Sequence, residues 1–373
     1  MAEATEETFV RPLDGVRVLD LSTYLAGPFA AKTLSDLGAD VIKVEPPTGD
    51  PYRAVGPQRD DSGIYWANGN SGKRSVVIDL KTPEGLARLK RLLADADIMI
   101  ENWRPSVAAK LGLPQEEVAR EFPRLVRLSI TGYGPDGPLV TEPVYDALIQ
   151  GRTGLLAFEA ADGVPRATNH FLADKVGAAY AGQMALVGLI ARDKTGKGVH
   201  LQSSMLDILS FYNFPDMMQH RTYVDDTRDW TIPPQVVVPT RDGHIVVSPV
   251  TGKQLSATLG VLGKSEWKEE FKQIADGRER SQLFFERIAE PLREKTTAEW
   301  LPLFQEAGVP VAPVNDPTTQ LSEPQVAHNA IYSELDTPRG RVRAPRYPMT
   351  IDGHRLTTRS YAPRLGEHDA ELP

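Results

Sequence analysis

The fold is predicted by one stretch near the start of the chain, Val16-Arg17-Val18-Leu19-Asp20-Leu21, and by the two segments that follow it, Ala26 to Leu37 and Asp40-Val41-Ile42-Lys43-Val44-Glu45. The first and last of these are short, nearly continuous apolar runs and predict strands. The middle segment predicts a helix, because Pro28 suits the first turn and Gly38 suits the C-cap. Two such strands joined by a helix predict a parallel sheet covered on both faces.

The same alternation of strands and helices continues to about residue 130. Strands are predicted over 75–80, 97–101 and 125–130, and helices over 82–94 and 114–121. Parallel strands that alternate with helices are typical of doubly wound folds. We therefore expect a Rossmann-like large α/β domain, to which a helix over 178–193 and a strand over 199–204 also belong.

The remainder of the chain has a different pattern. Residues 211–234 mix aromatic, methionine and charged residues without a clear period and are interpreted as a crossing linker. Residues 235–315 predict a small α+β domain, with a strand pair around Arg241-Asp242-Gly243, several helices and a strand near 309–314. The expected organisation is a large domain over 1–210, the linker, the small domain, and a C-terminal segment over 316–373 that returns to the large domain.

Composition narrows the range of functions. The 373 residues are 41% hydrophobic and 25% charged, and the net charge of −8 is unfavourable for nucleic acid as a main partner. The sequence contains no cysteine, which excludes disulfides, thiolate metal sites and a cysteine nucleophile. No stretch has the length and hydropathy of a membrane span or a signal peptide. We expect a cytoplasmic protein without a membrane partner.

Asp174 opens the segment that is most informative about function. It stands in His170-Phe171-Leu172-Ala173-Asp174, ahead of a predicted helix lined with glycine and alanine. A carboxylate at a helix start is expected to be held ionised by free backbone N–H groups and the helix dipole, as a nucleophilic aspartate requires. Helix capping is the alternative interpretation, because aspartate is among the preferred N-cap residues.

Other motifs favour a phosphorylated ligand without a bound metal or redox cofactor. The first strand–helix turn contains only Ala26-Gly27-Pro28 and lacks the glycine fingerprint of nicotinamide and flavin sites. The seven histidines show no metal-ligand spacing. Two turns carry cations beside predicted strands, Asn70-Ser71-Gly72-Lys73-Arg74 and Glu101-Asn102-Trp103-Arg104. Lysine and arginine can bind phosphate and Trp103 can stack on a base, although solvated loop charges remain the alternative.

Taken in order along the chain, these segments resemble the family III CoA-transferases, the group that includes formyl-CoA and carnitine CoA-transferases. The segments that carry the resemblance cover most of the chain and are Pro12-Leu13-Asp14-Gly15, Ala26-Gly27-Pro28, Leu37-Gly38-Ala39-Asp40, Lys73-Arg74-Ser75, Glu101-Asn102-Trp103-Arg104-Pro105, Thr131-Gly132-Tyr133-Gly134, Asp174-x-x-Gly177, Thr195-Gly196-Lys197-Gly198, Glu323-Pro324-Gln325-Val326 and Leu365-Gly366-Glu367-His368.

The resemblance implies that Asp174 is a nucleophile that carries first an acyl group, as a mixed anhydride, and then CoA, as an aspartyl thioester. It also implies that Tyr145 and Asp146 belong to the catalytic site. Racemases of the family carry a histidine where Tyr145 stands, so transfer is favoured over the alternative, a 2-methylacyl-CoA racemase or acyl-CoA isomerase. A non-catalytic CoA-binding protein is the third alternative.

The resemblance further implies the ligands and the assembly. CoA and acyl-CoA are expected as substrates, together with a carboxylic acid, and no cofactor is expected to be bound permanently. The residues expected to bind CoA are Asn70, Lys73, Arg74, Asn102, Trp103, Arg104 and Lys110. The family forms interlocked homodimers. Pro46 stands where some members of the family have arginine, and Leu25 stands where formyl-CoA transferases have glutamine, so the resemblance does not name the donor and acceptor acids.

Overall fold

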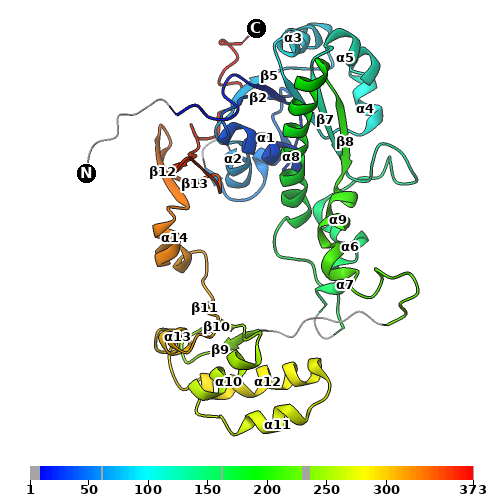
Figure 1. Ribbon diagram of the computed structural model, residues 1–373. Coiled ribbons are helices and arrows are strands. Elements are labelled where there is room, and N and C mark those ends of the chain that lie inside the picture. The colour runs from blue at the N-terminus through cyan, green and yellow to red at the C-terminus, as the bar shows by residue number, and fades with distance from the viewer. Residues whose placement is uncertain (1–8, 60–61, 161–162, 229–235, 373) are drawn as a thin grey trace. The chain divides into compact units, whose positions relative to one another are not determined.

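The computed structural model describes residues 9–59, 62–160, 163–228 and 236–372 (Figure 1). The chain divides into two compact units, one made of Met1–Arg228 with Ala330–Pro373 and the other of Asp229–Asn329. The last part of the predicted linker, 229–234, lies outside the described residues. Each unit is therefore described by itself.

A six-stranded parallel sheet forms the centre of the first unit. Its strands, in spatial order, are β5 (Arg74–Val77), β2 (Asp40–Glu45), β1 (Arg17–Asp20), β6 (Ile98–Glu101), β7 (Val126–Thr131) and β8 (His200–Ser204). Every neighbouring pair is parallel. Counted along the chain, this is the 3-2-1-4-5-6 order of Rossmann-like sheets. The predicted doubly wound fold is confirmed, and the strand order reverses between β1 and β6.

Helices cover both faces of the sheet (Figure 1). Val18 of β1 is buried in the cluster that contains residues of α1 (Ala26–Asp36) and α8 (Leu172–Thr195), and Leu19 in the cluster that contains residues of α3 (Pro83–Ala94) and α5 (Gln115–Glu121). This alternation is expected for a strand with two covered faces, because successive side chains point to opposite sides. It explains why the strands read as continuous apolar runs.

The small residues of α8 serve helix packing. Ala178, Ala181 and Ala185 are fully buried, and a Cβ added at Gly182 would lie 3.0 Å from Oγ1 of Thr33 on α1. Glycine and alanine therefore allow α8 and α1 to approach closely. The helix is also longer than predicted, since it begins at Leu172 and not near Ala178.

A second correction concerns the start of the predicted linker. Residues from Phe211 were expected to be irregular, but helix α9 runs over Met205–Met217. The side chain of Ser204 caps it by accepting a hydrogen bond from Asp207 N, and Ile208 and Leu209 are buried. A buried apolar face and a good cap stabilise this helix in spite of its mixed composition.

Short elements complete the first unit around the ends of the sheet. They are η1 (Pro51–Ala54), β3 (Gln58–Arg59), β4 (Ser62–Gly63), α2 (Ile64–Asn70), α4 (Pro105–Lys110), α6 (Asp146–Arg152), α7 (Leu155–Phe158), the hairpin of β12 (Tyr332–Thr337) and β13 (Gly340–Pro345), and the hairpin of β14 (Thr350–Ile351) and β15 (His354–Arg355). Near the C-terminus, His368 N donates to Ser75 O at 3.0 Å, and Val77 N donates to Asp369 Oδ1 at 2.9 Å. These bonds attach the C-terminal segment to β5.

The second unit has the small α+β architecture predicted from the sequence. Its antiparallel sheet has the order β11 (Val311–Pro313), β10 (His244–Val247), β9 (Val237–Pro239). Its larger helices are α10 (Gly252–Val261), α11 (Trp267–Gln273), α12 (Gly277–Leu292) and α13 (Thr297–Glu306). The same unit also contains η2 (Thr319–Ser322) and α14 (Pro324–His328), close to its end at Asn329. Among the helices described in either unit, none combines the length and the apolar character that a membrane span requires.

Candidate active site

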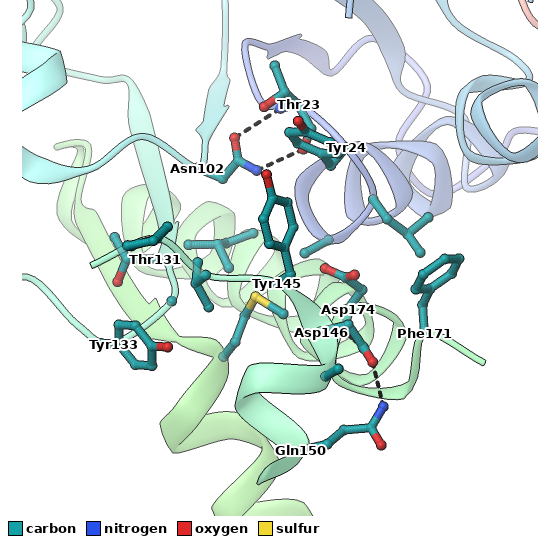
Figure 2. A pocket seen from close by; sticks show the side chains of 18 of the residues that line it. Thr23, Tyr24, Asn102, Thr131, Tyr133, Tyr145, Asp146, Gln150, Phe171 and Asp174 are labelled. Atoms are coloured by element: carbon teal, nitrogen blue, oxygen red, sulfur yellow. Dashed lines mark hydrogen bonds between the residues drawn. The ribbon is translucent and has the colours of Figure 1, made fainter. Parts of the chain in front are cut away.

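A cavity of about 690 Å³ lies at the carboxyl ends of β1, β6 and β7. Residues 23–26 line it after β1, residues 102–104 after β6, and residues 130–134 at and after the end of β7. This is the edge where the strand order reverses, the usual ligand crevice of doubly wound sheets. Asp174, Tyr145 and Asp146 all line the cavity, so the structure brings the three predicted catalytic residues together (Figure 2).

Asp174 is the third residue of α8 and does not cap the helix. The N-cap is Phe171, which makes no side-chain capping bond. The Asp174 carboxylate lines the cavity and accepts no hydrogen bond from any residue that the structure describes (Figure 2). The capping interpretation of this residue is therefore wrong, and its carboxylate is available to a ligand.

The protonation of Asp174 also differs from the sequence-based expectation. Burial, together with the negative charge of Asp146, raises the pKa of the Asp174 carboxyl from 3.8 to about 7. Both causes disfavour the charged form. Desolvation and repulsion by Asp146 therefore act against the ionised form that was expected at the helix start.

Asp146 holds the start of α8 in place. It is the first residue of α6 and is buried, and its Oδ1 accepts a hydrogen bond from Asp174 N at 3.1 Å. Its Oδ2 accepts from Gln150 Nε2 at 2.5 Å, and Gln150 Oε1 accepts from the backbone N of Thr168 at 3.2 Å. Asp146 is thus a positioning residue in this structure. Our sequence analysis missed Gln150, because it predicted no helix over 146–152, where the i,i+4 spacing from Asp146 would have indicated the pair.

Tyr145 presents its phenol ring to the cavity. Its side chain is exposed and makes an edge-to-face contact with Tyr24, with ring centroids 5.9 Å apart. Burial, followed by a hydrogen bond with Tyr145, raises the pKa of the Tyr24 phenol. Tyr24 was also missed, since a single tyrosine in a loop gives no sequence signal.

Three of the residues predicted to bind CoA line the same cavity: Asn102, Trp103 and Arg104. Asn102 joins the two loops at the switch point, because its Nδ2 donates to Thr23 O at 2.8 Å and its Oδ1 accepts from Thr23 N at 2.9 Å (Figure 2). Arg104 is exposed at the start of α4 and has no partner among the described residues. A cation is therefore free at this side of the cavity.

Asn70 and Lys73 lie elsewhere, in the core of the first unit. The Lys73 ammonium is fully buried and donates to Asp20 Oδ2, Pro28 O and Asn70 Oδ1, each at 2.7 Å. Burial lowers the pKa of Lys73 to about 8. All three ammonium hydrogens are used inside the protein, so this structure does not bring Lys73 or Asn70 to the cavity.

The two remaining cations predicted to bind CoA also lie away from Asp174. Arg74 donates to both carboxylate oxygens of Asp40, at 3.0 and 2.6 Å, and lines a separate cavity of about 810 Å³. Lys110 is exposed at the end of α4. The structure therefore divides the predicted set into three residues at the cavity and four outside it.

Comparison with known proteins identifies the family of this chain. The sequence profile described as CoA-transferase family III matches residues 13–369. The chain is 32% identical to human succinyl-CoA:glutarate CoA-transferase, over 97% of this chain and 85% of that protein. It is 33% identical to the acetyl-CoA:oxalate CoA-transferase of Acetobacter aceti, over 100% and 97% of the two chains.

A solved structure shows the same fold. A CaiB/BaiF family protein from Brucella suis superposes with a TM-score of 0.86 at 30% sequence identity, over 96% of this chain and 98% of that one. The match covers both compact units and not the Rossmann-like sheet alone. The chain belongs to CoA-transferase family III.

Proposed function

We propose that this enzyme transfers CoA between carboxylic acids through covalent intermediates on Asp174, with acyl-CoA and a free acid as substrates. One observation carries the assignment to this residue. Asp174 is a carboxylate at the switch-point cavity whose oxygens have no partner among the described residues. Asp146, by contrast, uses both of its oxygens for hydrogen bonds.

The reaction divides one exchange into balanced steps. The Asp174 carboxylate attacks the donor thioester carbonyl, the C–S bond breaks, and CoA leaves as a thiolate, which gives an acyl-aspartyl anhydride. The thiolate attacks the aspartyl carbonyl and releases the donor acid, which leaves an aspartyl-CoA thioester. The acceptor carboxylate displaces the thiolate to form a second anhydride. The thiolate then attacks the acceptor carbonyl, which yields acyl-CoA and regenerates Asp174.

The surrounding residues have supporting roles in this proposal. Asp146 fixes the backbone of Asp174 through the 3.1 Å bond to its N–H. The Tyr145 phenol, at the same cavity, would donate a hydrogen bond to the oxyanion formed at each attack. Trp103 and Arg104 lie at the β6 side, where the nucleotide part of CoA would contact a ring and a cation. No cofactor other than substrate CoA takes part in these steps.

The nucleophile is tested by replacing it. Asp174→Ala should abolish CoA exchange while CoA binding, measured by calorimetry, is retained. Glu142→Gln, which removes another carboxylate lining the same cavity, is the matched control and should keep exchange. Turnover by Asp174→Ala would contradict the mechanism.

Isotope transfer tests the anhydride itself. An acceptor acid labelled with heavy oxygen places its bridging oxygen on Asp174 when the second anhydride is cleaved. Mass spectrometry of the peptide that contains Asp174 should therefore show one heavy oxygen after a single turnover and up to two after many. A peptide without label after many turnovers would exclude the anhydride.

A racemase or isomerase of the same fold is the second candidate, favoured by the raised pKa of Asp174. A carboxyl with a pKa of about 7 is suited to proton transfer at neutral pH. Incubation of a 2-methylacyl-CoA in heavy water without any acceptor acid decides between them. Incorporation of deuterium at the α-carbon would favour racemisation, and its absence favours transfer.

We also propose that the active enzyme is the interlocked homodimer that the family resemblance implies, and that it is cytoplasmic. The support for self-association is an apolar surface on α8 and α9. Val187, Ile190, Phe211 and Phe214 are each at least half exposed. Exposed patches of this kind are typical of protein interfaces. Sedimentation equilibrium should give twice the chain mass, and Phe211→Glu should weaken the dimer.

A further inference from the structure

An aromatic cluster forms one side of the catalytic cavity. Tyr24 lies in the loop after β1, Tyr52 in η1, Tyr65 in α2 and Phe171 at the N-cap of α8. All four line the cavity, and we call them the aromatic wall. Tyr52 and Tyr65 are stacked at 6.2 Å, and Phe171 meets both edge-on, at 6.5 and 5.9 Å. Tyr24 continues the wall toward Tyr52, with ring centroids 6.2 Å apart.

The aromatic wall stands beside the nucleophile. Phe171 is the N-cap of α8, three residues before Asp174 (Figure 2). Burial and then the charge of Asp174 raise the pKa of Tyr52 to about 12, so this phenol remains protonated next to the carboxylate. An acyl group bound covalently to Asp174 would therefore occupy a cavity that these rings line.

The protein holds the aromatic wall in place against a backbone preference. Tyr24 has φ of +64°, a conformation that residues with a Cβ adopt rarely and at a cost. Asp50 Oδ1 accepts hydrogen bonds from Tyr24 N at 3.2 Å and from Tyr52 N at 2.9 Å. Lys43 Nζ lies 3.3 Å from Asp50 Oδ2, and both of these side chains are fully buried. A carboxylate held in a buried ion pair thus fixes the backbone that carries two of the four rings.

The charges around the cavity restrict the acyl group. Among its lining residues, Glu142, Asp146 and Asp174 are acidic; the basic residues are Arg104, in the loop after β6, and His170, next to Phe171. The aromatic wall supplies no cation, and the faces of aromatic rings carry partial negative charge. A second carboxylate on the acyl chain would lose hydration there without gaining a charged partner. An apolar ring would gain edge-to-face and stacking contacts.

We propose that the aromatic wall selects the acyl group, and that it favours an acid with an apolar ring, such as an arylacetate, over a short dicarboxylate. This inference rests on the proposed CoA transfer and names its substrate class. Asp50 and Lys43 act as positioning residues for the wall.

The test measures exchange of each labelled acid into its own CoA thioester, so that no second substrate has to be known. Phenylacetate with phenylacetyl-CoA is compared with glutarate and glutaryl-CoA, with purified full-length protein. We expect kcat/KM for the phenylacetyl pair to be about 10-fold or more above that for the glutaryl pair, from the burial of one ring.

Variants assign the preference to the aromatic wall. Tyr24→Gly and Phe171→Ala should each lower this ratio about 10-fold, whereas Tyr24→Phe, which keeps the ring, should leave it unchanged. Ala330→Gly is the matched control, because Ala330 also has a positive φ, of 46°, but does not line the cavity. Phe171 makes no capping bond, so Phe171→Ala gives an independent measurement if Tyr24→Gly folds poorly.

The possible outcomes distinguish a failure of the aromatic wall's role from a failure of the proposed CoA transfer. Exchange of the glutaryl pair in preference to the phenylacetyl pair, or a ratio that neither Tyr24→Gly nor Phe171→Ala changes, would overturn the role of the aromatic wall and leave CoA transfer standing. Absence of exchange for every pair with the wild-type enzyme would instead overturn CoA transfer itself.

Discussion

Replacing Asp174 by asparagine should stabilise the protein, and the gain should increase with pH. The carboxyl has a pKa of about 7 in the folded state, against an ordinary value of 3.8 in the unfolded chain. The folded state therefore binds the proton more tightly. The contribution of this group to stability is complete below 3.8 and is lost as the pH rises to about 7. An asparagine side chain has nearly the same shape as aspartate but carries no ionisable group, so the variant should not lose stability in this way as the pH rises.

The magnitude follows from the shift in pKa. About three pKa units correspond to about 4 kcal/mol of unfolding free energy once the pH is well above 7. About 1.5 kcal/mol of this is already lost near pH 5, so about 2.5 kcal/mol develops between about pH 5 and about pH 8. Because Asp174 keeps some contact with solvent, these values are upper limits.

Thermal unfolding followed by circular dichroism at several pH values measures the effect. With about 2 °C per kcal/mol for a chain of this size, Asp174→Asn should raise Tm by up to about 8 °C near pH 8 and about 3 °C near pH 5. Glu142→Gln removes an exposed charge from the same cavity and should change Tm little at either pH. A gain for Asp174→Asn that is equal at both pH values would refute the raised pKa.

Three further predictions concern other parts of the structure. Asp146→Asn should lower the pKa of Asp174 and move the acid limb of the pH–rate profile to lower pH. The pKa should stay above 3.8, because burial is the larger cause of its increase. An acid limb that does not move would contradict repulsion between the two carboxylates. Lys73→Met should reduce the unfolding free energy by about 3–5 kcal/mol in urea titrations, because it leaves the buried carboxylate of Asp20 without its closest cation. A loss below about 1 kcal/mol would contradict a structural role for Lys73. Gly188→Ala should lower the unfolding free energy by about 1–3 kcal/mol, because the new Cβ would lie 2.4 Å from a buried valine methyl on β7. Gly260→Ala, which has open space around it, should instead raise the unfolding free energy. Equal effects of the two substitutions would argue against the close contact at Gly188.

Sequence patterns predicted the central sheet well because its signals are local. The strands at 16–21 and 40–45 are apolar runs whose two faces are both buried, and turn and cap residues mark the helix between them. The prediction was poorer at Phe211, where tertiary burial of Ile208 and Leu209 stabilises a helix that the composition of the segment does not indicate.

The candidate site was predicted only in part, because some of its residues depend on tertiary contacts that local sequence does not indicate. The ordered motifs identified Asp174, Tyr145 and Asp146 as a group, and the structure places them at one cavity. They did not reveal Gln150 or Tyr24, whose roles depend on contacts between segments distant in the chain. They also could not show that the ammonium of Lys73 is enclosed by Asp20, Pro28 and Asn70.

By itself, the sequence determined the doubly wound fold and the family, because strand and helix periodicity and an ordered series of short motifs are properties of the chain alone. Only the tertiary structure decided what each charged group does. Lys73 and Asp174 are both ionisable residues beside predicted turns or helix starts, but burial gives the first three internal partners and leaves the second facing a cavity with a raised pKa. Desolvation and long-range contacts set these properties, and neither can be read from neighbours in the sequence.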